Sequence, residues 1–237
     1  MKIDQMLLTP NPYSRPGIRL DKVTKVAVHY TGNPGSTAKN NRDYFENLKD
    51  THYTYVSSHY VVGLNGEVIQ CIPENEWSYC TNQANGYSIS IETCHPDKTG
   101  KFNAATEQAL AELVADICKR HGLDPIRDVI RHYDVTGKHC PLWYVTHPGD
   151  WDSFRERVKA LLEPEKWAVR VQHFDMRARA EETAGQMKAL GFYNEIRTDP
   201  ANGKYVVDVF SFIAREKAAA LAWALNNTRY SIVRKVE

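Results

Sequence analysis

The stretch RHYDVTGKHCP, residues 131–141, gathers side chains whose types could do chemistry. His132 closes a short apolar run, and Cys140 follows it across a turn, just before a proline. A second histidine in the same kind of place, His29, closes the apolar run KVAVHY. The chain between His132 and Cys140 is long enough to leave a strand, loop back and present a thiolate beside the imidazole.

Two imidazoles and one thiolate form a soft ligand set, which favours zinc over magnesium or calcium. Three protein ligands leave the fourth tetrahedral position to water, as in catalytic rather than structural zinc sites. Taken singly, a histidine at a sheet edge is more often structural, and a buried cysteine is usually inert packing. Both histidines, however, end predicted strands, where α/β domains place their sites. We therefore predict a zinc site of His29, His132 and Cys140.

Two further polar residues could act beside such a metal. Glu92 lies on the polar face of the alternating run YSISIET, residues 87–93. It is either part of a solvated strand face or a general base beside the attacking water. Lys138 precedes Cys140 by two positions, so in an extended segment both side chains point the same way. A lysine there could stabilise an oxyanion, although a loop lysine is most often only solvated.

Strands and helices alternate along the first two thirds of the chain. The pair Asn65-Gly66 lies between two β-rich runs and predicts a hairpin over residues 58–73 with a tight primed turn. Ser36 could cap a helix over about residues 37–49. Two more apolar-striped helices are expected, one between Asn103 and Gly122 and one starting at Pro148. This order predicts an α/β domain with a central mixed sheet flanked by helices.

Composition narrows the class of protein. The chain has 237 residues, a net charge of +1, 42% hydrophobic and 25% charged residues, which is typical of a globular protein. The absence of a strong basic field argues against a nucleic-acid partner, and the first twenty residues contain no apolar run typical of a secretory signal or membrane span. The five cysteines show no repeated spacing, so we expect free thiols made in a reducing cytosol. The oligomeric state stays open.

A charged, proline-containing stretch, EPEKW (163–167), predicts a linker. After it, a strand-helix-strand pattern occurs twice, beginning at Trp167 and at Tyr205. Two such halves predict a small α+β unit, a sheet with two helices on one face. We therefore expect two domains, residues 1–163 and residues 167–237.

Four motifs in this order carry a family resemblance: VAVHYTGNPGSTA, SSHYVVGLNGEVIQCIPENEWSYCTN, SISIETC and RHYDVTGKHCP. Over roughly residues 20–162 the chain resembles the type-2 N-acetylmuramoyl-L-alanine amidases, a zinc amidase fold shared by phage endolysins and peptidoglycan recognition proteins. The resemblance implies zinc ligands at His29, His132 and Cys140. It also implies an acidic catalytic residue at Glu92 and a catalytic loop lysine at Lys138. All five positions are filled, which favours an active enzyme.

The reaction implied by this resemblance is hydrolysis of the amide between N-acetylmuramic acid and the L-alanine of the peptidoglycan stem peptide. Zinc would activate a water, Glu92 would take its proton and later protonate the leaving amine, and Lys138 would share the oxyanion with the metal. Two residues are expected to bind substrate. Trp77 matches a family position near the cleft, although a core tryptophan is equally consistent. His59 alternates with Val61 on its strand and is predicted to border the cleft.

Residues 167–237 resemble the SPOR fold, a peptidoglycan-binding module, on WAVRVQHF, the helix after it and GKYVVDVFSF. Small ferredoxin-like domains share this architecture with many functions. If the resemblance holds, this unit binds glycan strands and raises the effective concentration of substrate at the enzyme. The absence of a secretory signal at the start implies an endolysin that accumulates in the cytoplasm of the host bacterium and acts on the wall after release.

Two other functions remain open at this point. A non-catalytic peptidoglycan sensor would be expected to have lost a metal ligand or the acid. A cysteine peptidase would use Cys140 as nucleophile and His132 as its base.

Overall fold

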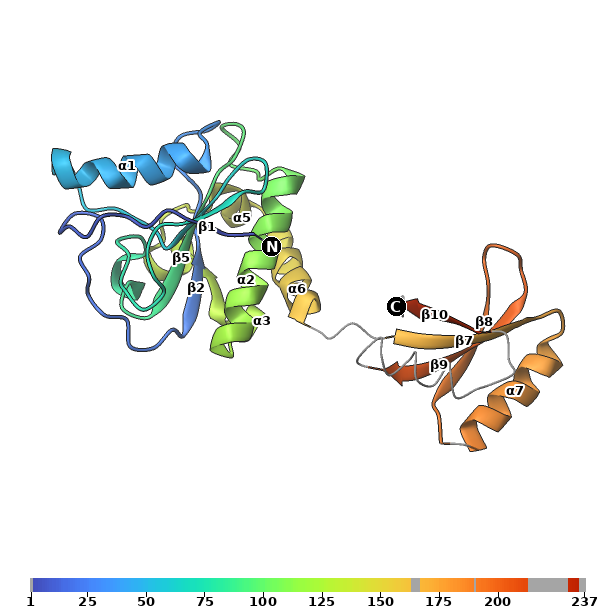
Figure 1. The fold of residues 1–237 in the computed structure, drawn as a ribbon. Helices are drawn as coiled ribbons and strands as arrows, with labels where there is room; N and C mark the ends of the chain where they lie inside the picture. The colour runs from blue at the N-terminus through green and yellow to red at the C-terminus, as the bar shows by residue number, and fades with distance from the viewer. Residues whose placement is uncertain (1, 163–166, 190, 213–229, 235–237) are drawn as a thin grey trace. The chain divides into compact units, whose positions relative to one another are not determined.

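The structure is a computed structural model that describes residues 2–162, 167–189, 191–212 and 230–234. The chain divides into two compact units, Met1–Leu162 and Glu163–Glu237, and each has its own sheet (Figure 1). Within the described residues, none of the helices has both the length and the apolar character needed to cross a bilayer.

The first unit is built on a six-stranded mixed sheet in the order β1-β4-β3-β5-β2-β6. The strands β3, β5, β2 and β6 run parallel to one another, whereas β4 is antiparallel to β3. This arrangement confirms the predicted central mixed sheet. The strands are β1 Asp4–Gln5, β2 Lys25–Val28, β3 Tyr60–Val62, β4 Val68–Gln70, β5 Ser88–Thr93 and β6 Val129–Arg131.

Helices cover both faces of this sheet (Figure 1). On one face, α2 (Ala104–His121) and α6 (Pro148–Leu162) enclose the main core together with β2 and β5. On the other face, α1 (Ala38–Thr51) packs Phe45 against β3 and β4. Because β5 is covered on both sides, its serines Ser88 and Ser90 are completely buried. The solvated strand face considered for Glu92 is therefore absent at these serines, and Glu92 itself is half-buried. The shorter helices are η1 Asn82–Ala84, α3 Pro125–Asp128, α4 His132–Thr136 and α5 Leu142–Thr146.

The helix ends follow the sequence with one correction. The N-cap of α1 is Thr37, not Ser36: the Thr37 hydroxyl accepts a hydrogen bond from the Asn40 backbone N–H at 3.1 Å. The Asn40 side chain accepts one in return from the Thr37 N–H, so the pair forms a reciprocal capping box. As predicted, α2 begins after Asn103 and ends at Gly122, which has a positive φ of 66°.

The hairpin of β3 and β4 is confirmed, but its turn differs from the prediction. A tight primed turn would require positive φ at both Asn65 and Gly66. Only Gly66 has one, at 81°, because the strands are separated by a longer loop. The carboxylate of Glu67 accepts the Asn65 backbone N–H at 3.0 Å and so stabilises this loop.

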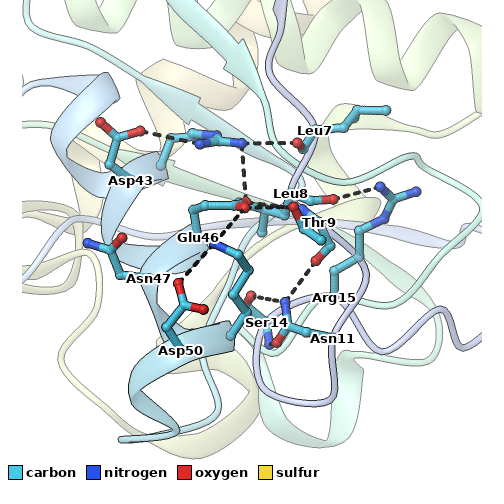
Figure 2. A network of polar contacts seen from close by, with 12 residues as sticks. Leu7, Leu8, Thr9, Asn11, Ser14, Arg15, Asp43, Glu46, Asn47 and Asp50 are labelled. Carbon is cyan, nitrogen blue, oxygen red and sulfur yellow. Dashed lines mark hydrogen bonds and ion pairs between the residues drawn. The ribbon is translucent and has the colours of Figure 1, made fainter.

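The segment ahead of β2, residues 6–15, is held against α1 by polar contacts (Figure 2). Arg42 donates to the backbone carbonyl of Leu7 at 3.0 Å. Glu46 accepts from both the backbone N–H of Thr9, at 3.0 Å, and its hydroxyl, at 2.7 Å. Backbone hydrogen bonds also tie the start of the segment to the end of β4, from the Met6 N–H to the Gln70 carbonyl at 3.0 Å and from the Leu8 N–H to the Cys71 carbonyl at 2.8 Å.

All five cysteines are free, as expected from their spacing. Cys118 of α2 is 1% exposed and packs in the main core. Cys140 and Cys80, by contrast, lie at the candidate site.

The second unit has a four-stranded antiparallel sheet in the order β10-β7-β9-β8, with α7 packed against it. Strands begin at Trp167 and Tyr205, as predicted. Residues 163–166 of the predicted linker and the predicted second helix of this unit lie outside the described residues. The elements are β7 Trp167–Phe174, α7 Arg177–Ala189, β8 Asn194–Thr198, β9 Tyr205–Phe212 and β10 Tyr230–Arg234.

Candidate active site

Two histidines meet at one edge of the sheet because their strands are parallel neighbours. His29 directly follows β2, and His132 directly follows β6. Both side chains are buried, and their ring centroids are 4.8 Å apart at an interplanar angle of 65°. The strand predicted to end on His132 stops one residue earlier, at Arg131, and His132 begins α4.

The loop after α4 returns the chain to these histidines. Gly137 ends α4 with a φ of 76°, a left-handed conformation that favours glycine. The backbone N–H of Tyr133 then donates to the carbonyl of Cys140 at 3.0 Å. The buried Cys140 Sγ lies 3.7 Å from His29 Nδ1. As a result, one potential ligand atom from each of His29, His132 and Cys140 lies within 4.8 Å of the others.

The protonation of His132 fits a metal ligand. Its Nε2 lies 3.0 Å from the side-chain carbonyl oxygen of Asn82. A carbonyl oxygen only accepts, so Nε2 carries the proton and Nδ1 keeps its lone pair. That Nδ1 is buried, and no described residue gives it a hydrogen bond. His29 is arranged alike, with Nε2 2.9 Å from the Thr81 hydroxyl and Nδ1 towards Cys140. Two imidazole lone pairs and a thiol thus converge, which fits a three-ligand zinc site.

The electrostatics of these side chains agree with this assignment. Burial lowers the pKa of His29 well below its usual value, and His132 and Lys138 lower it further. Burial, assisted by Lys138, lowers the pKa of His132 to about 4. Both imidazoles are therefore neutral at pH 7 and available as ligands. Burial and Glu92 raise the pKa of Cys140 to about 12, so a metal has to displace the thiol proton.

Glu92 lies beside this cluster, near the end of β5. Cys80 Sγ lies 3.7 Å from its Oε1, while its Oε2 is buried and accepts no hydrogen bond from the described residues. Burial raises the pKa of Glu92 to about 7, although Lys138 and Cys80 act in the opposite direction. A carboxyl group in this range can both accept and return a proton at neutral pH. Burial also raises the pKa of the Cys80 thiol well above its usual value.

Lys138 lies exposed on the loop between α4 and Cys140. Its positive charge lowers the pKa of four groups of the site, namely His29, Glu92, His132 and Cys140. The loop thus brings a cation to the cluster.

The two residues predicted to bind substrate have other contacts here. Trp77 is partly buried against the main core, with Gly86 close to its ring. His59 is fully buried, and its Nδ1 accepts the Ser90 backbone N–H at 3.0 Å while its Nε2 donates to the Glu76 carbonyl at 2.8 Å. No ring nitrogen of His59 is left for a substrate. These contacts do not support the predicted substrate roles, which stay predictions.

Sequence reasoning assigned no role to four residues that orient the site, and it placed one of them, Asp134, in a loop, whereas the structure places it in α4. Thr81 and Asn82 contact the two histidines and Cys80 contacts Glu92. Asp134 accepts the backbone N–H of Arg131 at 2.8 Å and its guanidinium at 2.7 Å, which fixes the start of α4. Asp134 lies three residues after Arg131, the N-cap of α4, and a carboxylate at that spacing is a known sequence signal for a helix start.

This fold and cluster together define an α/β protein with a candidate three-ligand metal site and an adjacent buried carboxyl group. The chain belongs to the N-acetylmuramoyl-L-alanine amidase family, whose model matches residues 19–143. The match confirms the resemblance drawn from the four motifs.

Curated relatives agree with the family assignment. N-acetylmuramoyl-L-alanine amidase BlyA of Bacillus subtilis (strain 168) is 37% identical over 172 residues, 64% of this chain and 45% of the relative. N-acetylmuramoyl-L-alanine amidase CwlL of Bacillus licheniformis is 39% identical over 175 residues, 68% of this chain and 48% of the relative. The chain thus spans about half the length of the curated relatives it matches.

Solved structures show the same fold. A mutant endolysin from Bacillus subtilis superposes with a TM-score of 0.56 at 26% identity, covering 67% of this chain and 99% of that one.

Proposed function

We propose that the protein is a zinc-dependent N-acetylmuramoyl-L-alanine amidase that hydrolyses the amide between N-acetylmuramic acid and L-alanine in peptidoglycan. The observation that carries the proposal is the convergence of His29, His132 and Cys140 within 4.8 Å, beside the buried carboxyl group of Glu92. The relatives BlyA and CwlL are themselves named N-acetylmuramoyl-L-alanine amidases.

In this mechanism His29, His132 and the Cys140 thiolate would hold the metal. When bound, zinc supplies Lewis acidity and makes hydroxide available near pH 7. The free Oε2 of Glu92 takes the proton of the attacking water and later returns a proton to the leaving amine of L-alanine. Lys138 stabilises the negative charge that develops on the carbonyl oxygen.

Digestion of purified peptidoglycan tests the bond that is cleaved. We expect new free amino groups on L-alanine, without new reducing sugars, because the amide and not the glycosidic bond is hydrolysed. A muramidase digest of the same material is the control for reducing ends. Reducing ends in place of new L-alanine amino groups, or neither product, would overturn the proposed reaction.

The site contacts favour a metal ligand over a peptidase nucleophile at Cys140. The ring nitrogen within hydrogen-bonding distance of the Cys140 sulfur, at 3.7 Å, belongs to His29. The peptidase hypothesis instead requires His132 in this place. An activated cysteine has a lowered pKa, whereas burial raises that of Cys140. A non-catalytic sensor would lack a ligand or the acid, and this chain keeps both.

We further propose that the second unit, residues 167–237, is a SPOR-like module that binds peptidoglycan glycan strands. Its antiparallel sheet order and the sequence resemblance support this assignment. The full chain carrying Glu92→Gln is expected to co-sediment with peptidoglycan and to be displaced by glycan strands freed of peptide. Binding that such strands do not displace would argue for another wall polymer or another partner.

A role as a phage endolysin completes the proposal, supported by the likeness to a solved endolysin. The enzyme would accumulate in the host cytoplasm and reach the wall after release. Cells producing it should stay intact until their membrane is permeabilised, and lysis without permeabilisation would contradict this role.

A further inference from the structure

Three consecutive residues, Cys80, Thr81 and Asn82, each contact a different group of the candidate site. Cys80 Sγ lies 3.7 Å from Glu92 Oε1, Thr81 Oγ1 lies 2.9 Å from His29 Nε2, and Asn82 Oδ1 lies 3.0 Å from His132 Nε2. We call residues 80–82 the orienting segment.

We propose that the orienting segment fixes the direction of both imidazoles and of the Glu92 carboxyl group, and that Cys80 serves as a positioning thiol and not as a metal ligand. This inference rests on the proposed function, since it assigns supporting residues to the same site.

The backbone of the orienting segment is itself held in place. The side-chain oxygen of Asn85 accepts the backbone N–H of Cys80 at 3.2 Å and that of Thr81 at 2.7 Å. Asn82 has a positive φ of 52°, a left-handed conformation that asparagine tolerates better than most residues. This local geometry allows neighbouring side chains to reach three different targets.

The hydrogen bonds set the protonation of the histidines. The Asn82 oxygen requires a proton on Nε2 of His132, which leaves Nδ1 as the ligand atom. Thr81 Oγ1 is also 2.7 Å from Ser90 Oγ, so its hydroxyl can donate to Ser90 and accept from His29 Nε2. That direction keeps His29 Nδ1 free of a proton and facing Cys140. Partners of this kind typically change metal affinity by about 10- to 100-fold.

Cys80 has two possible roles that the geometry separates. With His29 and Glu92 it forms a second group of potential ligand atoms within 4.8 Å. However, its thiol proton has an acceptor in Glu92 Oε1, while Oε2 of the same carboxylate stays without a described partner. A thiol that donates to Oε1 fixes the carboxyl group and leaves Oε2 available to take a proton, so Cys80 acts as a positioning donor.

Cobalt substitution tests whether Cys80 ligates the metal. The thiolate-to-cobalt charge-transfer band of the Co²⁺-loaded protein reports the thiolates bound. We expect wild type and Cys80→Ala to show the same band, consistent with one thiolate, and Cys140→Ala to lose it. A band in wild type that falls to about half in Cys80→Ala would show two thiolates and overturn the proposed role of Cys80.

Matched variants test the orientation of the histidines. Thr81→Val keeps the shape but removes the hydroxyl, and Asn82→Gly removes the amide while allowing positive φ. Each is expected to weaken zinc binding by about 10- to 100-fold in competition with a chromophoric chelator. Thr81→Ser and Asn82→Asp keep an acceptor and should restore most of the affinity. Wild-type affinity in Thr81→Val and Asn82→Gly would overturn this part of the inference.

Cys80 should instead affect the rate. At saturating zinc, Cys80→Ala is expected to lower kcat about tenfold, because Glu92 loses one hydrogen bond, and Cys80→Ser should recover most of it through its hydroxyl. Zinc affinity should not change in either variant. An unchanged kcat in Cys80→Ala, or no recovery in Cys80→Ser, would overturn the positioning role. Metal affinity is measured without substrate, so an inactive wild type would refute the proposed function and leave the histidine test valid.

Discussion

Glu92→Gln is expected to lower amidase activity by about 10²- to 10⁴-fold, the usual contribution of a general acid–base group. Glutamine has nearly the same shape, but its amide cannot take a proton from the attacking water. Oε2 is buried and accepts no hydrogen bond from the described residues, so in the wild type it is available to take this proton. The measurement is the rate of release of L-alanine amino groups from peptidoglycan at saturating zinc.

Zinc affinity is the control that separates catalysis from metal binding in this variant. It should stay at the wild-type value, because Glu92 is not among the three proposed ligands. Glu156→Gln, on the exposed surface of α6, is a matched substitution that should leave activity unchanged. If Glu92→Gln lost zinc as well as activity, the second ligand group, with His29 and Cys80, would become the preferred metal site.

The convergence of His29, His132 and Cys140 was predictable because each side chain follows a signal that can be read in the sequence. His29 and His132 end apolar runs, and the carboxyl ends of adjacent parallel strands meet at one edge of a sheet. Gly137 marks the turn that returns Cys140 to the same point. Neither inference required knowledge of what covers the sheet.

The surroundings of the cluster were not predictable in this way, because they depend on tertiary packing. Alternation placed Glu92 and Ser90 on one face of β5, but only the covering elements show that Ser90 is buried and Glu92 half-buried. His59 was expected to border the cleft, whereas both its ring nitrogens form hydrogen bonds with backbone groups. Asn82 reaches His132 through a positive φ that its residue type permits but does not require.

Chelation is expected to abolish activity, and zinc to restore it, because the metal holds and activates the attacking water. Magnesium should not substitute, since it prefers oxygen ligands to imidazole and thiolate. The experiment also separates the two roles of Cys140. As a metal ligand, Cys140 should resist a thiol-alkylating reagent in the zinc-loaded protein and react only after chelation.

As a nucleophile, Cys140 would give the opposite pattern. Activity would survive chelation and be lost to the alkylating reagent whether or not zinc is present. The test is best made in a Cys80→Ser background, because Cys80 is less buried than Cys140 and could react first. Activity that survives chelation in this background and then falls on alkylation would exclude the metal mechanism. Cys140 would then be the nucleophile and not a metal ligand.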